Sequence, residues 1–221
     1  KRFIEELDKI PFPAIDLLPL EKYFDIGVAH GGLVKKRKFL SLVTSRGCPA
    51  RCIFCSTHTI WGRQYRARSP ENIVEEIILA KKKFGIEEVV FADDNLTFDR
   101  GRAKRIFRLM IDNKLNISWI APNGVAVWTL DEETIDLMKA SGCLKICFPV
   151  ESGDQYVLDQ IIKKPVKLEQ VKQLISYSRK IGLDCGMFLV VGLPGEKEEN
   201  IKRSFAFARK SRIYPFVSVA T

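Results

Sequence analysis

The hydrophobic positions of the chain alternate regularly from Phe39 onwards. Short apolar runs, typical of buried strands, are separated by longer segments whose apolar residues recur at helical spacing. The predicted strands cover residues 39–44, 88–92, 117–121, 144–150, 184–191 and 216–220, and the predicted helices cover 69–84, 99–113, 131–141, 168–181 and 196–210. Six strands alternating with five helices predict an α/β fold with parallel strands.

Capping residues and strand composition support this alternation. Ser69 precedes Pro70 as an N-cap, and Gly85, Gly142 and Gly182 follow three of the predicted helices. The strands are apolar on both faces, as 188–191 shows, and buried parallel strands require that. Right-handed crossovers would curl such a sheet into a partial (β/α)6, TIM-like barrel with the helices outside.

The ends of the chain predict a fragment of a longer protein. Residues 1–38 are proline-punctuated and are interpreted as a linker from a missing upstream domain. Residues 39–221 then form the barrel, which we expect to be truncated at its C-terminus because the sequence stops directly after a strand. We find neither an apolar run of about eighteen residues, which a membrane span needs, nor a signal segment.

Charge and cysteine content narrow the class of protein. Of the 221 residues, 36 are basic and 27 acidic, a net charge of +9, but the basic residues spread along predicted helix faces. A small-molecule substrate is therefore favoured over nucleic acid. Three of the six cysteines crowd together and three are scattered through apolar segments, which favours a metal site in a reducing cytoplasm over disulfides.

Polar residues follow the predicted strands. The clustered cysteines follow the first strand, and the next four strands are followed by 93–95, 122–124, 151–154 and 192–196. In barrels of this kind the chemistry lies at the C-terminal ends of the strands. We therefore expect these segments to converge on one active site.

The cysteine run is Cys48, Cys52 and Cys55, with the spacing C-x-x-x-C-x-x-C. Three thiolates in one short loop can hold a 4Fe–4S cluster and leave one iron without a protein ligand, which favours chemistry at that iron. A zinc site completed by His58 is one alternative, since zinc takes four ligands. A non-enzymatic electron-transfer module is another, although it would want a fourth cysteine.

With Phe54 before the last cysteine, this run resembles the signature of the radical S-adenosylmethionine (radical SAM) superfamily. The resemblance covers about residues 39–221 and implies a partial six-stranded barrel. It also implies that S-adenosylmethionine binds the open iron and is cleaved by one electron to a 5′-deoxyadenosyl radical, which takes hydrogen from substrate. An electron donor such as flavodoxin or ferredoxin is implied as a partner.

The resemblance assigns further cofactor contacts. Asp93 and Asp94 would bind the methionine amino group, partly through backbone carbonyls, and Glu151 and Ser152 would contact the ribose hydroxyls. Val191 would flank the adenine, and the backbone near Phe54 would read the adenine edge together with Val219 and Ala220. Asp93 and Asp94 have an alternative as turn residues, and Glu196 is interpreted as a structural carboxylate at a helix N-terminus. Arginines 63, 66 and 68 either pair with a carboxylate of cofactor or substrate or belong to a solvated loop. No catalytic acid, base or hydrogen donor is predicted.

Two segments narrow the resemblance to a subgroup. Residues 7–16 with Tyr23, and residues 55–62 with 65–70, resemble the cobalamin-dependent enzymes, which include methyltransferases and an anaerobic porphyrin ring cyclase. An upstream domain holds the cobalamin in those enzymes, so cobalamin is an expectation from resemblance. The alternative within the superfamily is a methylthiotransferase-like enzyme acting on tRNA or a ribosomal protein.

Overall fold

The computed structural model describes residues 3–30 and 32–220. Its main strands form two parallel three-stranded sheets, with the orders β3-β6-β7 and β8-β9-β10. The predicted α/β alternation is therefore confirmed, with strand ends shifted by one to two residues at most positions. The six strands are β3 (Phe39–Leu42), β6 (Glu88–Phe91), β7 (Ser118–Ile120), β8 (Lys145–Glu151), β9 (Asp184–Val191) and β10 (Tyr214–Val219).

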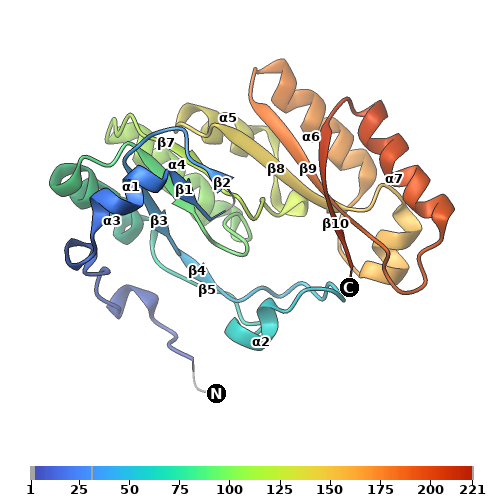
Figure 1. Ribbon diagram of the computed structural model, residues 1–221, viewed down its shortest axis with the longest axis horizontal. Helices are drawn as coiled ribbons and strands as arrows, with labels where there is room; N and C mark the ends of the chain where they lie inside the picture. The colour runs from blue at the N-terminus through green and yellow to red at the C-terminus, as the bar shows by residue number, and fades with distance from the viewer. Residues whose placement is uncertain (1–2, 31, 221) are drawn as a thin grey trace.

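The two sheets join at one narrow point. A single parallel bridge links Trp119 of β7 to Cys143, reinforced by hydrogen bonds from Trp119 N to the Gly142 carbonyl and from Leu144 N to the Trp119 carbonyl. Together the sheets form one curved wall (Figure 1). β3 and β10 are its outer strands and do not pair with each other in the described structure, so the barrel is open, as a partial (β/α)6 fold predicts.

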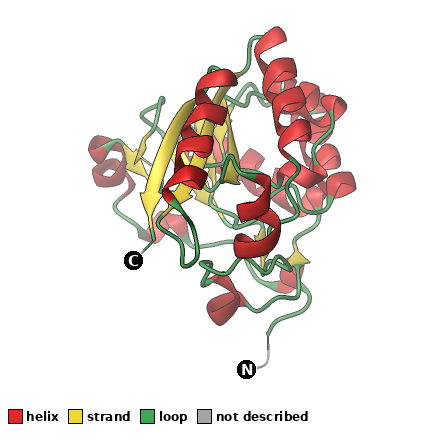
Figure 2. Ribbon diagram, turned by 90° about the vertical axis from the view of Figure 1, so that its right-hand side faces the viewer, coloured by secondary structure: helices red, strands yellow, loops and turns green. Residues whose placement is uncertain are grey.

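Five helices cover the outer face of this wall (Figure 2). Their apolar faces form the core with the strands; at its centre the Trp119 ring stacks on Phe107 at 5.0 Å and meets Phe91 edge-on at 5.4 Å. None of the helices in the described ranges is long and apolar enough to cross a membrane. The five are α3 (Pro70–Phe84), α4 (Arg100–Asp112), α5 (Glu132–Ala140), α6 (Leu168–Lys180) and α7 (Glu198–Lys210).

The segment before Phe39 packs against the barrel. Leu7 and Phe24 are buried, and the Glu88 carboxylate at the start of β6 accepts hydrogen bonds from the backbone of Lys35 and Lys36. Its origin in an upstream domain stays a prediction, and residues 1–2, 31 and 221 lie outside the described ranges. It contains the short helices η1 (Leu7–Lys9), η2 (Ile15–Leu17) and α1 (Leu20–Ile26) and the hairpin of β1 (Val28–Ala29) and β2 (Gly32–Leu33).

The remaining elements are too short for hydrophobic periodicity to predict. β4 (Ser45–Arg46) and β5 (Arg66–Ala67) form an antiparallel pair that closes the loop carrying the cysteines, and α2 (Thr57–Trp61) lies within that loop. A 3-10 turn, η3 (Val127–Thr129), follows β7. A π-helical turn, η4 (Val157–Ile162), follows β8.

Candidate active site

The three cysteines lie on a loop whose two ends are tied together. We call residues 47–65 the cluster loop. It leaves β4 at Gly47 and returns at β5, and these strands pair Ser45 with Ala67 and Arg46 with Arg66. Gly47 has φ +84°, and a Cβ there would lie 2.1 Å from the Gln64 carbonyl oxygen. The cluster loop therefore requires glycine where it begins.

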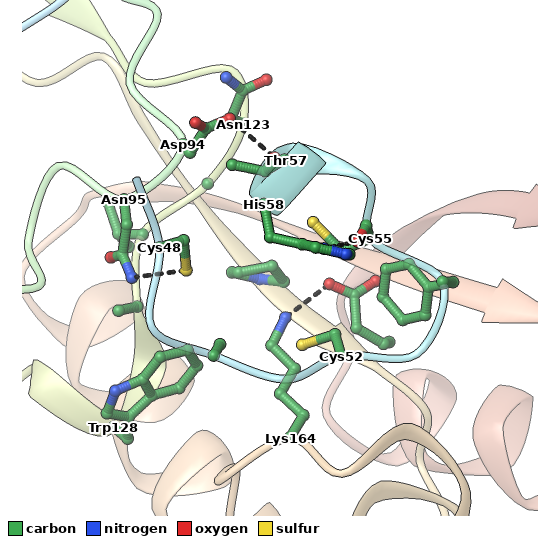
Figure 3. A pocket seen from close by; sticks show the side chains of 17 residues that line it. Cys48, Cys52, Cys55, Thr57, His58, Asp94, Asn95, Asn123, Trp128 and Lys164 are labelled. Carbon is green, nitrogen blue, oxygen red and sulfur yellow. Dashed lines mark hydrogen bonds and ion pairs between the residues drawn. The ribbon is translucent and has the colours of Figure 1, made fainter. Parts of the chain in front are cut away.

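The cluster loop forms one wall of a cavity of about 260 Å³, which we call the cysteine pocket. The opposite walls come from the loops after β6 and β7, from the end of β8 and from Lys164 beyond it, so the predicted convergence is present at the ends of these three strands. Segment 192–196 after β9 does not line it. The side chains used below are Cys48, Cys52, Phe54, Cys55, Thr57, His58, Asp94, Asn95, Asn123, Trp128, Glu151 and Lys164 (Figure 3).

All three cysteines are free thiols at the pocket wall. Burial raises the pKa of the Cys52 thiol to about 11, and the Lys164 ammonium opposes this rise. Cys48 is in contact with the Asn95 amide, whose Nδ2 lies 3.7 Å from the sulfur. The cluster loop thus offers three sulfur atoms to the pocket as possible metal ligands.

These residues fit an iron–sulfur cluster better than a zinc ion. Among the described residues, no three His, Cys, Asp or Glu side chains form a group that could hold one metal ion. A zinc site needs its ligands about 2 Å from a single centre, whereas the three thiolates of a four-iron cluster bind three different irons. His58 turns its Nδ1 to the Cys55 carbonyl at 3.0 Å, a local loop contact.

The two aspartates after β6 are placed differently. The Asp93 carboxylate is buried and accepts hydrogen bonds from Thr44 N (3.1 Å), Thr44 Oγ1 (2.8 Å) and Ser45 Oγ (2.5 Å), so it ties β6 to the base of the cluster loop. Burial raises its pKa, against the lowering effect of these bonds and of Arg102. Asp93 does not line the pocket, but its backbone carbonyl accepts a hydrogen bond at 3.1 Å from Nδ2 of Asn123, which does.

Asp94, in contrast, lines the pocket. Its carboxylate accepts a hydrogen bond from Thr57 Oγ1 at 3.2 Å, and burial raises its pKa against the effect of that bond and of His30. His30, from the segment before the barrel, meets Asn123 Oδ1 at 2.7 Å near the same rim. The Asp94 carboxylate therefore faces the cavity, where it can accept a hydrogen bond from the amino group of a ligand.

Of the two residues predicted to contact ribose, Glu151 lines the pocket and Ser152 does not. The Glu151 carboxylate is 2.6 Å from Lys164 Nζ. Ser152 is fully buried, and its hydroxyl meets Ser204 Oγ of α7 at 3.0 Å. The Ser152 side chain therefore fastens the end of β8 to α7, and its predicted ribose contact stays a prediction.

Of Phe54 and Val191, which are predicted to lie near adenine, one lines the pocket and one does not. Phe54 lines the pocket, with 39% of its surface exposed. Val191 lies at the end of β9, opposite Val219 of β10, and outside the pocket. Glu196 has a structural role, but in the loop before α7: its carboxylate accepts hydrogen bonds from Gly192 N at 2.7 Å and Leu193 N at 3.3 Å.

The three arginines after the cysteines support the cluster loop. Arg63 donates to the Ala50 carbonyl at 2.7 Å inside the loop. Arg66 is buried, donates to the carbonyls of Ile4 and Trp61, and lies 4.4 Å from the Phe3 ring centre. Arg68 pairs with Glu76 at 2.5 Å. Each of the three thus makes a contact within the protein, and Arg66 joins the N-terminal segment to the cluster loop.

Sequence reasoning missed several pocket residues. Lys164 follows the π-helical turn and reaches into the pocket from a segment without a recognisable pattern. Trp128 and Asn95 come from loops after β7 and β6. Asn95 and Asn123 could have been found as polar residues following strands, since both lie in segments that were singled out for that reason.

Fold and site define an open parallel-strand barrel with a three-cysteine cluster site at the C-terminal ends of its strands. The model of the Radical SAM superfamily matches residues 42–208, most of the chain. The chain belongs to this superfamily, and the assignment brings a 4Fe–4S cluster and S-adenosylmethionine as its cofactors.

Two relatives place the chain more closely. It is 38% identical over 212 residues to cytidylyl-2-hydroxyethylphosphonate methyltransferase of Streptomyces wedmorensis, covering 93% of this chain and 39% of the relative. It is 29% identical to anaerobic magnesium-protoporphyrin IX monomethyl ester cyclase of Rubrivivax gelatinosus, covering 93% and 35%. The chain thus spans less than half the length of either. These relatives favour the methyltransferase or cyclase interpretation over the methylthiotransferase and electron-transfer alternatives.

A solved structure confirms the fold. The radical S-adenosylmethionine methyltransferase TsrM from Kitasatospora setae, with cobalamin and a 4Fe–4S cluster bound, superposes with a TM-score of 0.74 over 83% of this chain and 34% of that protein. Identity is 19%, so the likeness concerns the barrel.

Proposed function

We propose that this chain is the catalytic barrel of a cobalamin-dependent radical SAM enzyme that methylates or cyclises a small-molecule substrate. The observation that carries the proposal is the cysteine pocket, in which three free thiols face a carboxylate, a buried ion pair and an aromatic ring at the strand ends. The 38% identity to a methyltransferase supports it.

Cys48, Cys52 and Cys55 would hold the cluster. When bound, the cluster and S-adenosylmethionine supply a 5′-deoxyadenosyl radical for hydrogen abstraction. The protein's own contribution is to hold the loop rigidly, through Gly47 at its base and Asp93 beneath it. These contacts would fix the position of the reacting groups.

The pocket offers complementary groups for S-adenosylmethionine. Asp94 would accept from the methionine amino group, Glu151 from the ribose hydroxyls, and Phe54 would lie against adenine. A carboxylate is suited to two neighbouring hydroxyls because its two oxygens both accept. Glu151 faces Lys164 here, so binding through Glu151 would share the carboxylate between the ammonium and the ribose.

Cobalamin would come from a part of the enzyme outside this barrel. TsrM binds cobalamin together with its cluster, and this chain covers 34% of TsrM, which supports a cobalamin-dependent enzyme of which this barrel is one part. An external one-electron donor such as flavodoxin or ferredoxin would reduce the cluster, and we expect the enzyme to act in the cytoplasm.

The test is anaerobic reconstitution with iron and sulfide, followed by dithionite reduction with S-adenosylmethionine. We expect about four irons per chain, as a single 4Fe–4S cluster requires, and formation of 5′-deoxyadenosine. Cys52→Ala should abolish both. Cys185→Ala is the matched control, because this partly buried free cysteine lies outside the pocket. Bound zinc, or an iron signal indifferent to S-adenosylmethionine, would contradict the proposal.

A further inference from the structure

Asn95 places an amide against one of the three cysteines. The residue is 4% exposed and lines the cysteine pocket, and Nδ2 lies 3.7 Å from Cys48 Sγ, within hydrogen-bond range of a sulfur (Figure 3). The amide oxygen has no hydrogen-bond partner in the described structure although it is buried. A buried polar group left unpaired calls for an explanation.

The orientation of this amide follows from the chemistry of the sulfur. A ligating thiolate can only accept hydrogen bonds, so Nδ2 must face it, and the opposite orientation would bring two acceptors together. The backbone of Asn95 has a separate turn role, since its carbonyl accepts from Phe98 N at 3.3 Å. That turn uses no side-chain atom and does not explain the amide.

The loop after β6 contacts the cluster loop at two points, one at the first cysteine and one after the last. Asn95 contacts Cys48 at one end, and Asp94 accepts from Thr57 at the other. The loop that carries Asn95 is therefore joined to the cluster loop at two points, one of which is the contact of the amide with Cys48.

We propose that Asn95 is a positioning residue that donates a hydrogen bond to the Cys48 thiolate and thereby raises the reduction potential of the cluster. This inference rests on the proposed function. Reduction adds one electron, so the reduced cluster carries more negative charge on its sulfurs, and a donor at a sulfur stabilises the reduced form more than the oxidised form. The protein would then make the first electron transfer easier.

The experiment is a redox titration of the reconstituted chain, with dithionite supplying the electron and EPR measuring the reduced cluster. Asn95→Leu keeps the size of the side chain and removes the donor. At a fixed applied potential, we expect a several-fold lower ratio of reduced to oxidised cluster, and a larger drop for Asn95→Asp, which adds a negative charge. Asn123→Leu is the control. This variant also removes a pocket amide, but one that donates to the Asp93 carbonyl, so the ratio of reduced to oxidised cluster should stay unchanged.

A second measurement on the unmodified chain needs no variant. With ¹⁵N in asparagine side chains, pulsed EPR of the reduced cluster should detect a nitrogen coupling that is lost in Asn95→Asp, if that variant holds its cluster. Absence of the coupling in the unmodified chain, or an unchanged potential in Asn95→Leu at full iron content, overturns the inference. Either result with 5′-deoxyadenosine still formed leaves the proposed function intact, whereas a chain that assembles no four-iron cluster fails both.

Discussion

The Glu151 carboxylate and the Lys164 ammonium form a 2.6 Å ion pair inside the cysteine pocket, with side chains only 9% and 7% exposed. The pair joins the end of β8 to the segment after the π-helical turn. Glu151 has φ +73°, unusual for a residue with a side chain, and a register shift in β8 lies between Pro149 and Glu151. Backbone strain of this kind costs about 1–3 kcal/mol and concentrates at functional sites.

Breaking this pair should destabilise the protein. Lys164→Met leaves the Glu151 carboxylate buried without its partner, which costs about 3–5 kcal/mol. The double variant Lys164→Met/Glu151→Gln has no unpaired buried charge. Its free energy of unfolding should therefore fall by less than that of Lys164→Met. Denaturant unfolding of the variants measures both changes.

The control for this prediction is an exposed ion pair. Lys172 and Glu169 are 3.1 Å apart with side chains 52% and 72% exposed. Lys172→Met should cost at most about 1 kcal/mol. If the double variant Lys164→Met/Glu151→Gln loses as much stability as Lys164→Met and Glu151→Gln lose in sum, the two side chains are not coupled.

Gly47→Ala should damage the cluster loop. The added Cβ would lie 2.1 Å from the Gln64 carbonyl oxygen at φ +84°, so the base of the loop must shift. We expect a loss of at least about 2 kcal/mol in the free energy of unfolding, and lower iron uptake on reconstitution. Gly27→Ala is matched in conformation, at φ +64°, but meets nothing within 4 Å. It should cost about 1 kcal/mol and leave iron uptake unchanged.

Much of the fold could be predicted from sequence because it depends on periodicity. α3 begins after Ser69, whose hydroxyl accepts from Asn72 N, and ends at Gly85 with φ +69°. These are local signals. The β4–β5 pair could not be predicted, since each strand has two residues and their pairing is a long-range event.

The site was predicted where its chemistry is tied to one segment. The three cysteines share a loop, so spacing alone indicated a cluster. Side-chain direction was not readable: Asp93 and Asp94 are neighbours, yet one carboxylate is buried beneath the loop and the other faces the pocket. Lys164 reaches the pocket only because a π-helical turn and a residue at φ +61°, Lys163, redirect the chain.

Asp93→Asn should weaken the support of the cluster loop. The carboxylate accepts from two hydroxyls and one backbone N–H, and an amide in its place turns one acceptor into a donor. We expect a loss of about 2–3 kcal/mol in denaturant unfolding. The exposed Asp136, which accepts from Tyr177 OH at 2.8 Å, gives the control Asp136→Asn with a loss below about 1 kcal/mol. Equal losses at the two positions would argue against the buried network.

Asp131 should make stability depend on pH in acid. Partial burial would raise the pKa of this N-cap carboxyl, but hydrogen bonds from Thr134 and Lys104 outweigh it and lower the pKa to about 2, from an ordinary 3.8. Folding therefore favours the ionised form, so its contribution is present above about pH 4 and is lost as pH falls through 2. Compared with Asp131→Asn, the unmodified chain should be more stable by about 0.5–1 kcal/mol at pH 6, since the carboxylate is one-third exposed. The difference should shrink steadily between pH 4 and 2.5 in denaturant unfolding. A gap that stays constant over this range would show that the charge of Asp131 does not contribute.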